Sequence, residues 1–320
     1  MKLSFLYSRL PAIILLICIV GISSCKKDNS PPPAPPVLDT LGTGWQIVTV
    51  PGNTGGFLDI FFVNNNVGWV AGQFLFKSLD GGVTWNKQTV LNDVAGFSNL
   101  FFVDELFGFA VRSDAMYRTK DGGASWKEIK ITGLANHYDV QFLNHRLGYA
   151  VGPGGLFKSV DSGNTWAKVP SAFAADAALY FLDSLKAWVF NSNSKPGYTS
   201  NGGLDFAISN SFTGTSVYAT QFIDPATGWA AGYNGAWRTA DAGATWSPMV
   251  QGHTSDIHFF NKNDGFVCHR NEVFRTSNGG QTLTRVAKIG VTQGFIELHF
   301  TDPNHGWVAS LDNYILRYAQ

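Results

Sequence analysis

The sequence predicts an all-β fold, a seven-bladed β-propeller of four-stranded antiparallel blades, and three observations carry this prediction. The composition is rich in turn and strand formers, with 35 Gly, 14% aromatic residues and only 14% charged residues. A unit of about 40 residues recurs seven times along the chain. The two ends of the chain hold complementary parts of the seventh unit.

Each unit is marked by a small residue followed by an aromatic one. These pairs are spaced by 37 to 41 residues and stand at 68–69, 108–109, 148–149, 187–188, 228–229, 265–266 and 306–307. In the first unit, strand-like segments at 58–64, 68–72, 74–78 and 84–90 are separated by Gly and Asn turns. Short strands at this spacing predict an up-and-down antiparallel sheet, and four of them make one propeller blade.

The chain ends predict how the ring closes. The seventh unit supplies strand-like segments at 295–300, 306–310 and 313–319, but no fourth one. Residues 42–50, GTGWQIVTV, match the fourth-strand segment TWNKQTV at 84–90. We therefore expect the N-terminal strand to complete the last blade, which closes the ring and removes a free sheet edge.

A second marker, of the form Ser/Thr-x-Asp-x-Gly-x-Thr/Ser-Trp, lies between the third and fourth strands. Its acidic position is held by Asp80, Asp121, Asp161, Asn201, Asp241 and Asn278. A short acidic side chain can accept hydrogen bonds from its own turn, and glycine permits the positive φ that such a turn needs. The distant Glu of a calcium loop and the Gly-Lys-Ser/Thr of a phosphate loop are both missing from the motif. We interpret the motif as a structural turn, and we expect neither a metal nor a cofactor.

Three segments are expected along the chain. Residues 1–24 combine Lys2 and Arg9 with a short apolar run and predict a lipoprotein signal peptide. Residues 22–25, ISSC, resemble a bacterial lipobox, which makes Cys25 the expected lipidation site; an ordinary signal peptide with a chance cysteine is the alternative. Residues 25–41 then form the lipidated, Pro-rich linker and residues 42–320 the propeller. These features predict a lipoprotein of the bacterial cell envelope, either periplasmic or surface-exposed.

The net charge and the cysteine content bear on two questions: whether the chain binds nucleic acid and whether it forms a disulfide. Removal of Lys2 and Arg9 with the signal leaves 23 − 2 = 21 basic residues against 23 acidic ones, so nothing indicates nucleic acid. With Cys25 acylated, Cys268 is the one remaining thiol of the mature chain, and no intrachain disulfide is expected.

The marker of the third-to-fourth-strand turn is the Asp-box, or BNR repeat. Units such as GYAVGPGGLFKSVDSGNTW (148–166) and GWAAGYNGAWRTADAGATW (228–246) resemble the Ycf48/Hcf136 photosystem II assembly-factor family. The resemblance covers about residues 45–320 and implies a seven-bladed propeller that acts as a binding or assembly module. The fourth and sixth units depart from the pattern, with Asn201 and Asn278 for the Asp and Phe206 and Leu283 for the Trp.

Polar side chains on the expected innermost strands are the weak candidates for catalysis. Asp59, Asp256 and Glu297 fall at one repeat position in three consecutive blades, and His258 and His299 lie two residues further on. Residues two apart share a strand face. The group could form an acid/base pair or hold a metal. The third, structural possibility is a hydrated polar lining of the central channel or hydrogen bonding to neighbouring strand ends. An acid/base pair would fit an alternative function, that of a glycan-acting hydrolase of the Asp-box superfamily similar to sialidases or xyloglucanases. A glycan-binding protein is a further alternative.

The candidates for binding lie on the face away from the Asp-box turns. Arg112, Tyr233, His269 and Arg270 stand at turn positions where the repeat demands no large residue. Loops on a rigid scaffold commonly carry binding residues, and Tyr and Arg are frequent in interface hot spots. We therefore predict a monomeric, non-enzymatic module that recognises an envelope protein through this face.

Overall fold

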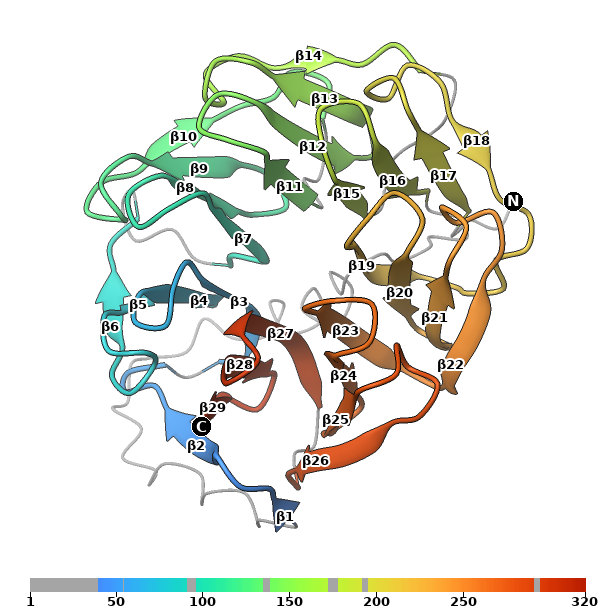
Figure 1. Ribbon diagram of the computed structural model, residues 1–320. Helices are drawn as coiled ribbons and strands as arrows, with labels where there is room; N and C mark the ends of the chain where they lie inside the picture. Colours follow the sequence, from blue (N-terminus) through green and yellow to red (C-terminus); the bar gives the residue numbers. More distant parts are fainter. Residues whose placement is uncertain are drawn as a thin grey trace, which may run out of the picture.

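The computed structural model describes residues 40–320 apart from 54, 91–95, 135–138, 172–177, 192–194 and 291–293. The segment expected to be a signal peptide, the expected lipidation site Cys25 and the expected linker as far as residue 39 lie outside the described residues. Within them the chain forms seven antiparallel sheets arranged in a ring (Figure 1), so the predicted all-β, seven-bladed propeller is confirmed. No helix in the described part of the chain is long and apolar enough to cross a membrane.

The first four blades run from the innermost to the outermost strand in chain order. Blade 1 holds β3 (Phe57–Phe62), β4 (Gly68–Gly72), β5 (Leu75–Ser78) and β6 (Asn86–Gln88). Blade 2 holds β7 (Asn99–Phe102), β8 (Gly108–Val111), β9 (Met116–Thr119) and β10 (Lys127–Ile129). Blade 3 holds β11 (Asp139–Phe142), β12 (Gly148–Gly152), β13 (Gly155–Ser159) and β14 (Ala167–Lys168). Blade 4 holds β15 (Leu179–Phe181), β16 (Ala187–Phe190), β17 (Pro196–Thr199) and β18 (Ala207–Ile208).

The last three blades include both chain ends. Blade 5 holds β19 (Val217–Phe222), β20 (Gly228–Gly232), β21 (Gly235–Thr239) and β22 (Ser247–Gln251). Blade 6 holds β23 (Thr254–Phe259), β24 (Gly265–His269), β25 (Glu272–Thr276) and β26 (Thr284–Lys288), with β1 (Thr40–Leu41) as a fifth strand. Blade 7 holds β27 (Phe295–Asp302), β28 (His305–Ser310), β29 (Tyr314–Ala319) and, outermost, β2 (Trp45–Thr49).

Ring closure follows the expected scheme. β2 pairs antiparallel with β29, from Trp45 opposite Tyr318 to Thr49 opposite Tyr314. Before β2, the chain adds β1 to blade 6, with Leu41 opposite Ala287. The sequence analysis placed Thr40 and Leu41 in the linker; their backbone instead pairs with a free outer edge.

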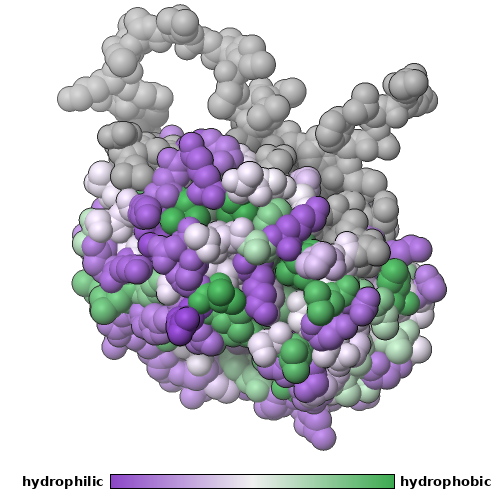
Figure 2. All heavy atoms as spheres, turned by 90° about the horizontal axis from the view of Figure 1, so that it is seen from above, coloured by the Kyte–Doolittle hydropathy of each residue, from purple (hydrophilic) through white to green (hydrophobic). Residues whose placement is uncertain are grey.

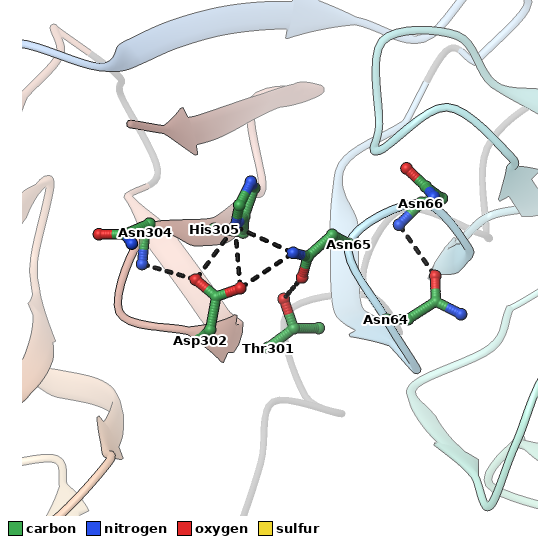
Figure 3. A network of polar contacts seen from close by, with 7 residues as sticks. All are labelled: Asn64, Asn65, Asn66, Thr301, Asp302, Asn304 and His305. Atoms are coloured by element: carbon green, nitrogen blue, oxygen red, sulfur yellow. Dashed lines mark hydrogen bonds and ion pairs between the residues drawn. The ribbon is translucent and has the colours of Figure 1, made fainter.

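Side chains also join the last blade to the first (Figure 3). Asn65 donates through Nδ2 to Asp302 Oδ2 at 2.9 Å and accepts the Thr301 hydroxyl through Oδ1 at 2.5 Å. His305 Nδ1 lies 2.9 Å from the same Asp302 oxygen. The turn after β3 is therefore tied to the end of β27 and the start of β28.

The core consists of aromatic stacks between neighbouring blades. At every interface the aromatic residue of a second strand stacks on the phenylalanine that ends the first strand of the next blade, with ring centroids 3.4–4.3 Å apart: Trp307–Phe62, Trp69–Phe102, Phe109–Phe142, Tyr149–Phe181, Trp188–Phe222, Trp229–Phe259 and Phe266–Phe300. Six of the seven aromatics follow a glycine and one follows Ala187, and the preference for glycine has a steric reason, because a Cβ at Gly68 would overlap the Phe62 ring. Stacks of this kind contribute about 0.5–1.5 kcal/mol each beyond the apolar area that they bury.

Seen edge-on, the ring shows hydrophobic residues scattered in small groups among hydrophilic ones (Figure 2). Such a mixture is usual for the outer surface of a water-exposed domain.

Candidate functional site

The polar groups of each Asp-box turn form hydrogen bonds with one another. In the first box, Asp80 accepts the Val83 and Thr84 N–H groups through Oδ1, at 3.0 and 2.9 Å, and the Thr84 hydroxyl through Oδ2. The Ser78 hydroxyl donates to the same carboxylate, and Trp85 Nε1 closes the turn on the Gly82 carbonyl at 3.1 Å. These internal bonds hold the pKa of the Asp-box carboxyls low, and in the third box, where the Thr165 hydroxyl is the largest cause, they lower the pKa of Asp161 to about 2.

Asparagine supports the same turn in two boxes. Asn201 accepts the Asp205 N–H through Oδ1 at 3.0 Å and donates through Nδ2 to the Asp205 carboxylate at 3.1 Å. Asn278 accepts the Thr282 N–H at 2.9 Å and donates to the Thr282 hydroxyl. The asparagine Nδ2 thus donates a hydrogen bond where the aspartate of the other boxes accepts one. Both turns therefore keep their structure although asparagine replaces the aspartate of the family pattern.

The carbonyl groups of the box turns face the preceding blade. The Gly81 carbonyl accepts Trp307 Nε1 at 2.9 Å and Arg317 Nε at 2.7 Å, both from blade 7. At other interfaces Lys77 donates to the Gly122 carbonyl at 2.8 Å and Arg118 to the Ser162 carbonyl at 2.6 Å. The boxes therefore connect neighbouring blades, and their polar groups form hydrogen bonds within the propeller rather than facing a ligand.

The inner-strand aspartates are engaged with backbone. Asp59, 4% exposed, accepts the Leu100 N–H of blade 2 at 2.6 Å. Asp256, 5% exposed, accepts its neighbour Ile257 N–H at 2.7 Å and the Leu298 N–H of blade 7 at 2.9 Å. Of the three alternatives for this group, the geometry favours hydrogen bonding between strands. Among the described residues, no cluster of three or more His, Cys, Asp or Glu side chains is arranged to hold a metal.

Two residues further along the inner strands, polar side chains form a second set of links between blades. Gln141 exchanges two hydrogen bonds with the backbone of Phe181, at 2.9 and 2.7 Å, and Gln221 does the same with Phe259. His299 makes one such bond, from Nε2 to the Phe62 carbonyl at 2.9 Å. Burial lowers the pKa of His299 to about 4, and burial together with His299 lowers the pKa of His258 to about 3. Both imidazoles are therefore neutral at pH 7.

Two of the four predicted binding residues come together, and two do not. Tyr233, 63% exposed, and Arg270 line one hollow on the face away from the boxes. His269 is only 8% exposed, with Nδ1 3.1 Å from the Thr254 hydroxyl, because it ends β24 opposite Thr254. The expectation that His269 offers a surface contact is therefore corrected. Arg112 is held by a two-point ion pair to Asp114 in its own turn, at 2.7 and 2.9 Å, and does not line this hollow.

The hollow has a volume of about 640 Å³ and lies between blades 5 and 6. It is lined by Thr213, Tyr233, Asn234, Trp237, Pro248, Val250, Gln251, Gly252, His253 and Arg270. Its wall is rigid, because Asn234 accepts the Thr215 N–H through its side chain at 2.8 Å and the Gly252 N–H through its carbonyl at 3.1 Å. Its size falls in the range of ordinary ligand pockets.

Arg270 is held in an unusual conformation. Its φ is +56°, in the left-handed region that favours glycine, at a hairpin turn between β24 and β25. Its N–H donates to the His253 carbonyl at 3.1 Å, and its own carbonyl accepts the Phe295 N–H at 2.9 Å. A large residue that persists in such a conformation is an indication of function.

His253 connects this hollow to the mouth of the central channel. It also lines a smaller hollow with Leu58, Ser98, Tyr218, Ser255, Ile296 and Glu297. Its ring lies 5.4 Å from Tyr218 and 6.2 Å from Tyr233. Burial and the nearby Arg270 lower the pKa of His253, and burial raises the pKa of Tyr218 to about 12. The sequence analysis missed His253; its position directly before the inner strand of blade 6 was the available signal.

Fold and turns together define a seven-bladed Asp-box propeller. Residues 39–134 match the family described as photosynthesis system II assembly factor YCF48. The resemblance that the repeat indicates is thus confirmed, and the chain carries the repeat of this family over those residues. No curated protein sequence matches the chain.

Solved structures share the fold. YCF48 bound to a D1 peptide is 21% identical with a TM-score of 0.72, and the alignment covers 89% of this chain and 99% of that one. YCF48 from Cyanidioschyzon merolae is 18% identical with a TM-score of 0.69, over 86% and 98% of the two chains. The GH74 enzyme of Niastella koreensis is 13% identical with a TM-score of 0.64, over 82% of this chain but only 43% of the enzyme.

Proposed function

We propose that the protein is a non-enzymatic binding or assembly module of the bacterial cell envelope, which recognises a protein partner through the propeller face away from the Asp-box turns. The observation that carries the proposal is the hollow between blades 5 and 6. It combines an exposed Tyr233 and an Arg270 with positive φ with the apolar lining residues Trp237, Pro248 and Val250. Aromatic and arginine side chains around an apolar centre are typical of interface hot spots.

The family resemblance supports the same class of function. The structurally similar YCF48 is known with a D1 peptide bound, so a propeller of this kind can take a polypeptide as its ligand. For the present chain we propose a protein partner of the envelope, bound by a monomeric propeller. The lipobox-like residues 22–25 support attachment to the membrane through Cys25, with the Pro-rich linker as a spacer.

The alternative of a glycan-acting hydrolase has weaker support. The fold is shared with GH74 enzymes. Glycosidases need two carboxyl groups placed about 5–10 Å apart that are free to exchange protons or attack the sugar. Asp59 and Asp256 are buried and accept backbone N–H groups of the next blade, and Glu297 lines the small hollow beside His253. The geometry therefore favours binding without chemistry.

Substitution of the two hollow residues tests the proposal. We choose Tyr233→Ala together with Arg270→Gly, because glycine tolerates the positive φ at position 270 and removes the guanidinium without straining the turn. The matched control is Val83→Ser, an exposed residue of the first box turn. The partner recovered from envelope extracts by the wild type should be lost with the double variant and retained with the control.

Thermal unfolding of the wild type, the double variant and the Val83→Ser control shows whether a loss of binding results from a loss of folding. The double variant should melt at or near the wild-type temperature, since Tyr233 is 63% exposed. Recovery of every partner at the wild-type level by a folded double variant would show that this face is wrong. Release of sugar from envelope glycans that is abolished by Glu297→Gln would favour the hydrolase instead.

A further inference from the structure

Blade 7 differs from the other six at the position of the Asp-box. In the described residues of this blade, no box turn follows the third strand. Two separate segments stand in its place: the end of β29 with Tyr318 and Gln320, and the turn Gly42–Trp45 that leads into β2. Between them and blade 6 lies a hollow of about 520 Å³, lined by Leu41, Gly42, Thr43, Trp45, Phe266, Arg275, Arg285, Val286, Tyr318 and Gln320.

At three other interfaces a cation from one blade meets the box turn of the next blade. The third-strand residue that pairs with the second-strand aromatic is Lys77 in blade 1, Arg118 in blade 2 and Arg317 in blade 7. Each of these side chains donates to the carbonyl after the Asp-box aspartate of the next blade, at 2.6–2.8 Å. The Asp-box carboxylates add charge attraction, as Asp121 does for Lys77 and Asp161 does for Arg118.

Arg275 is the equivalent residue of blade 6. It pairs across the sheet with Phe266, as Lys77 pairs with Trp69 and Arg118 with Phe109. Its guanidinium lies 5.6 Å from the centre of the Phe266 ring. Within the described residues no hydrogen bond or ion pair engages Arg275, whereas Arg285 on the other side of the hollow is paired with Glu272 at 2.9 Å. A half-buried cation thus points into a space from which its usual partner is missing.

We propose that this gap between blades 6 and 7 is a docking site for an acidic, glycine-containing turn of a partner protein, which takes the place that the Asp-box turn holds in the six other blades. Trp45, Phe266 and Tyr318 pack on one another as the aromatic wall of the gap and are only 1–6% exposed, which leaves Arg275 as the main contact for such a turn. Arg275 donates to a carbonyl of the turn, and the carboxylate of the turn offsets its charge, as in the neighbouring interfaces. The site lies on the Asp-box side and is separate from the hollow of Tyr233 and Arg270.

The described residues before β2 do not themselves supply the missing turn. Thr40 pairs with Lys288 and Leu41 with Ala287, while Arg285, nearer the start of β26, lines the hollow. The chain therefore enters β1 beside the end of β26 that is farther from the gap. An acidic turn from another protein is the occupant that the cation and the aromatic wall fit.

A peptide with the sequence of residues 157–168, FKSVDSGNTWAK, is the probe, because it reproduces the third box of this chain. Calorimetric titration of the purified protein should show binding that is about tenfold weaker with Arg275→Ala, and also weaker when the aspartate of the peptide is replaced by alanine. The matched control is Arg238→Ala, the same strand position in blade 5, where the box turn of blade 6 closes the interface through Trp229 Nε1 and the Gly279 carbonyl. This control should bind the peptide with wild-type affinity.

Arg275→Met serves as a second variant, because it keeps an aliphatic stem over Phe266 should the alanine variant lose stability. Absence of binding by the wild type at about 1 mM peptide, or equal binding by the wild type and both Arg275 variants, overturns the proposal. So does binding that is lost with Tyr233→Ala and Arg270→Gly instead. Self-association of the protein that disappears with Arg275→Ala would assign the gap to a second copy and overturn the choice of partner.

Discussion

His299→Gln should weaken the dependence of stability on pH without breaking the ring. His299 links blade 7 to blade 1 through one hydrogen bond to the Phe62 carbonyl. Gln141 and Gln221 hold the same repeat position in blades 3 and 5, and each makes two bonds to the next blade. Glutamine at position 299 can therefore replace the link and does not titrate.

The magnitude follows from the pKa difference between folded and unfolded chain. Burial lowers the pKa of His299 from 6.5 to about 4 in the folded state. Below pH 6.5 the unfolded chain binds a proton that the folded chain excludes, so stability is present at neutral pH and is lost as the pH falls. Between pH 7.5 and 5 the loss from this one residue is about 2 kcal/mol, and His258, whose pKa is also lowered, adds a further loss in the same direction.

Calorimetric unfolding at pH 7.5, 6 and 5 measures the effect. The melting temperature of the wild type should fall on acidification by about 4–8 °C more than that of His299→Gln. The reciprocal variant Gln141→His should fall more steeply than the wild type. Parallel pH curves for wild type and His299→Gln would refute the reasoning, because the imidazole would then not be desolvated in the folded ring.

Three further predictions concern the box, the closing strand and the anchor. Asp161→Ala should lower the free energy of unfolding by about 1–3 kcal/mol, since it leaves turn N–H groups without their acceptor. Asp161→Asn should lower it less, because Asn201 and Asn278 support the same turn in other blades. Equal losses for the two variants in chemical denaturation would contradict this. Deletion of residues 45–50 should expose the edge of β29 and cause aggregation, and a monomeric deletion variant with an unshifted melting curve would count against ring closure. Cys25→Ser should release the protein from the membrane fraction or leave it unprocessed, and unchanged lipid labelling would exclude the lipobox.

The architecture was predictable because the same sequence pattern recurs in seven units along the chain. The small-aromatic pair of each of the seven units and the Asp-box of six of them indicated the blade length, and the match between residues 42–50 and 84–90 indicated the closure. The structure adds the reason for the pair, which is the stack between each second-strand aromatic and the phenylalanine of the next blade. The extra strand β1 was not predictable, because two residues carry no periodic pattern.

The site was predictable only in part, because side-chain direction depends on neighbours from other blades. Tyr233 and Arg270 meet in one hollow, yet His269, adjacent to Arg270, points into the sheet and is buried. Arg112 was expected to be available, but Asp114 in its own turn engages it. Asp59 and Asp256 shared a repeat position that allowed chemistry, and only the packed ring shows that each accepts a backbone N–H of the next blade.

The binding face is the central claim, and site-specific photo-crosslinking in the envelope tests it most directly. A photoreactive amino acid is placed at Tyr233, at the rim of the hollow, or at Val83, an exposed box residue. Both positions are more than half exposed, so the two proteins should fold alike and differ only in the face that they probe. We expect a discrete crosslinked partner from position 233 that is suppressed by Arg270→Gly, and none from position 83. The same partner captured only from position 83 would place the binding surface on the Asp-box side and contradict the proposal.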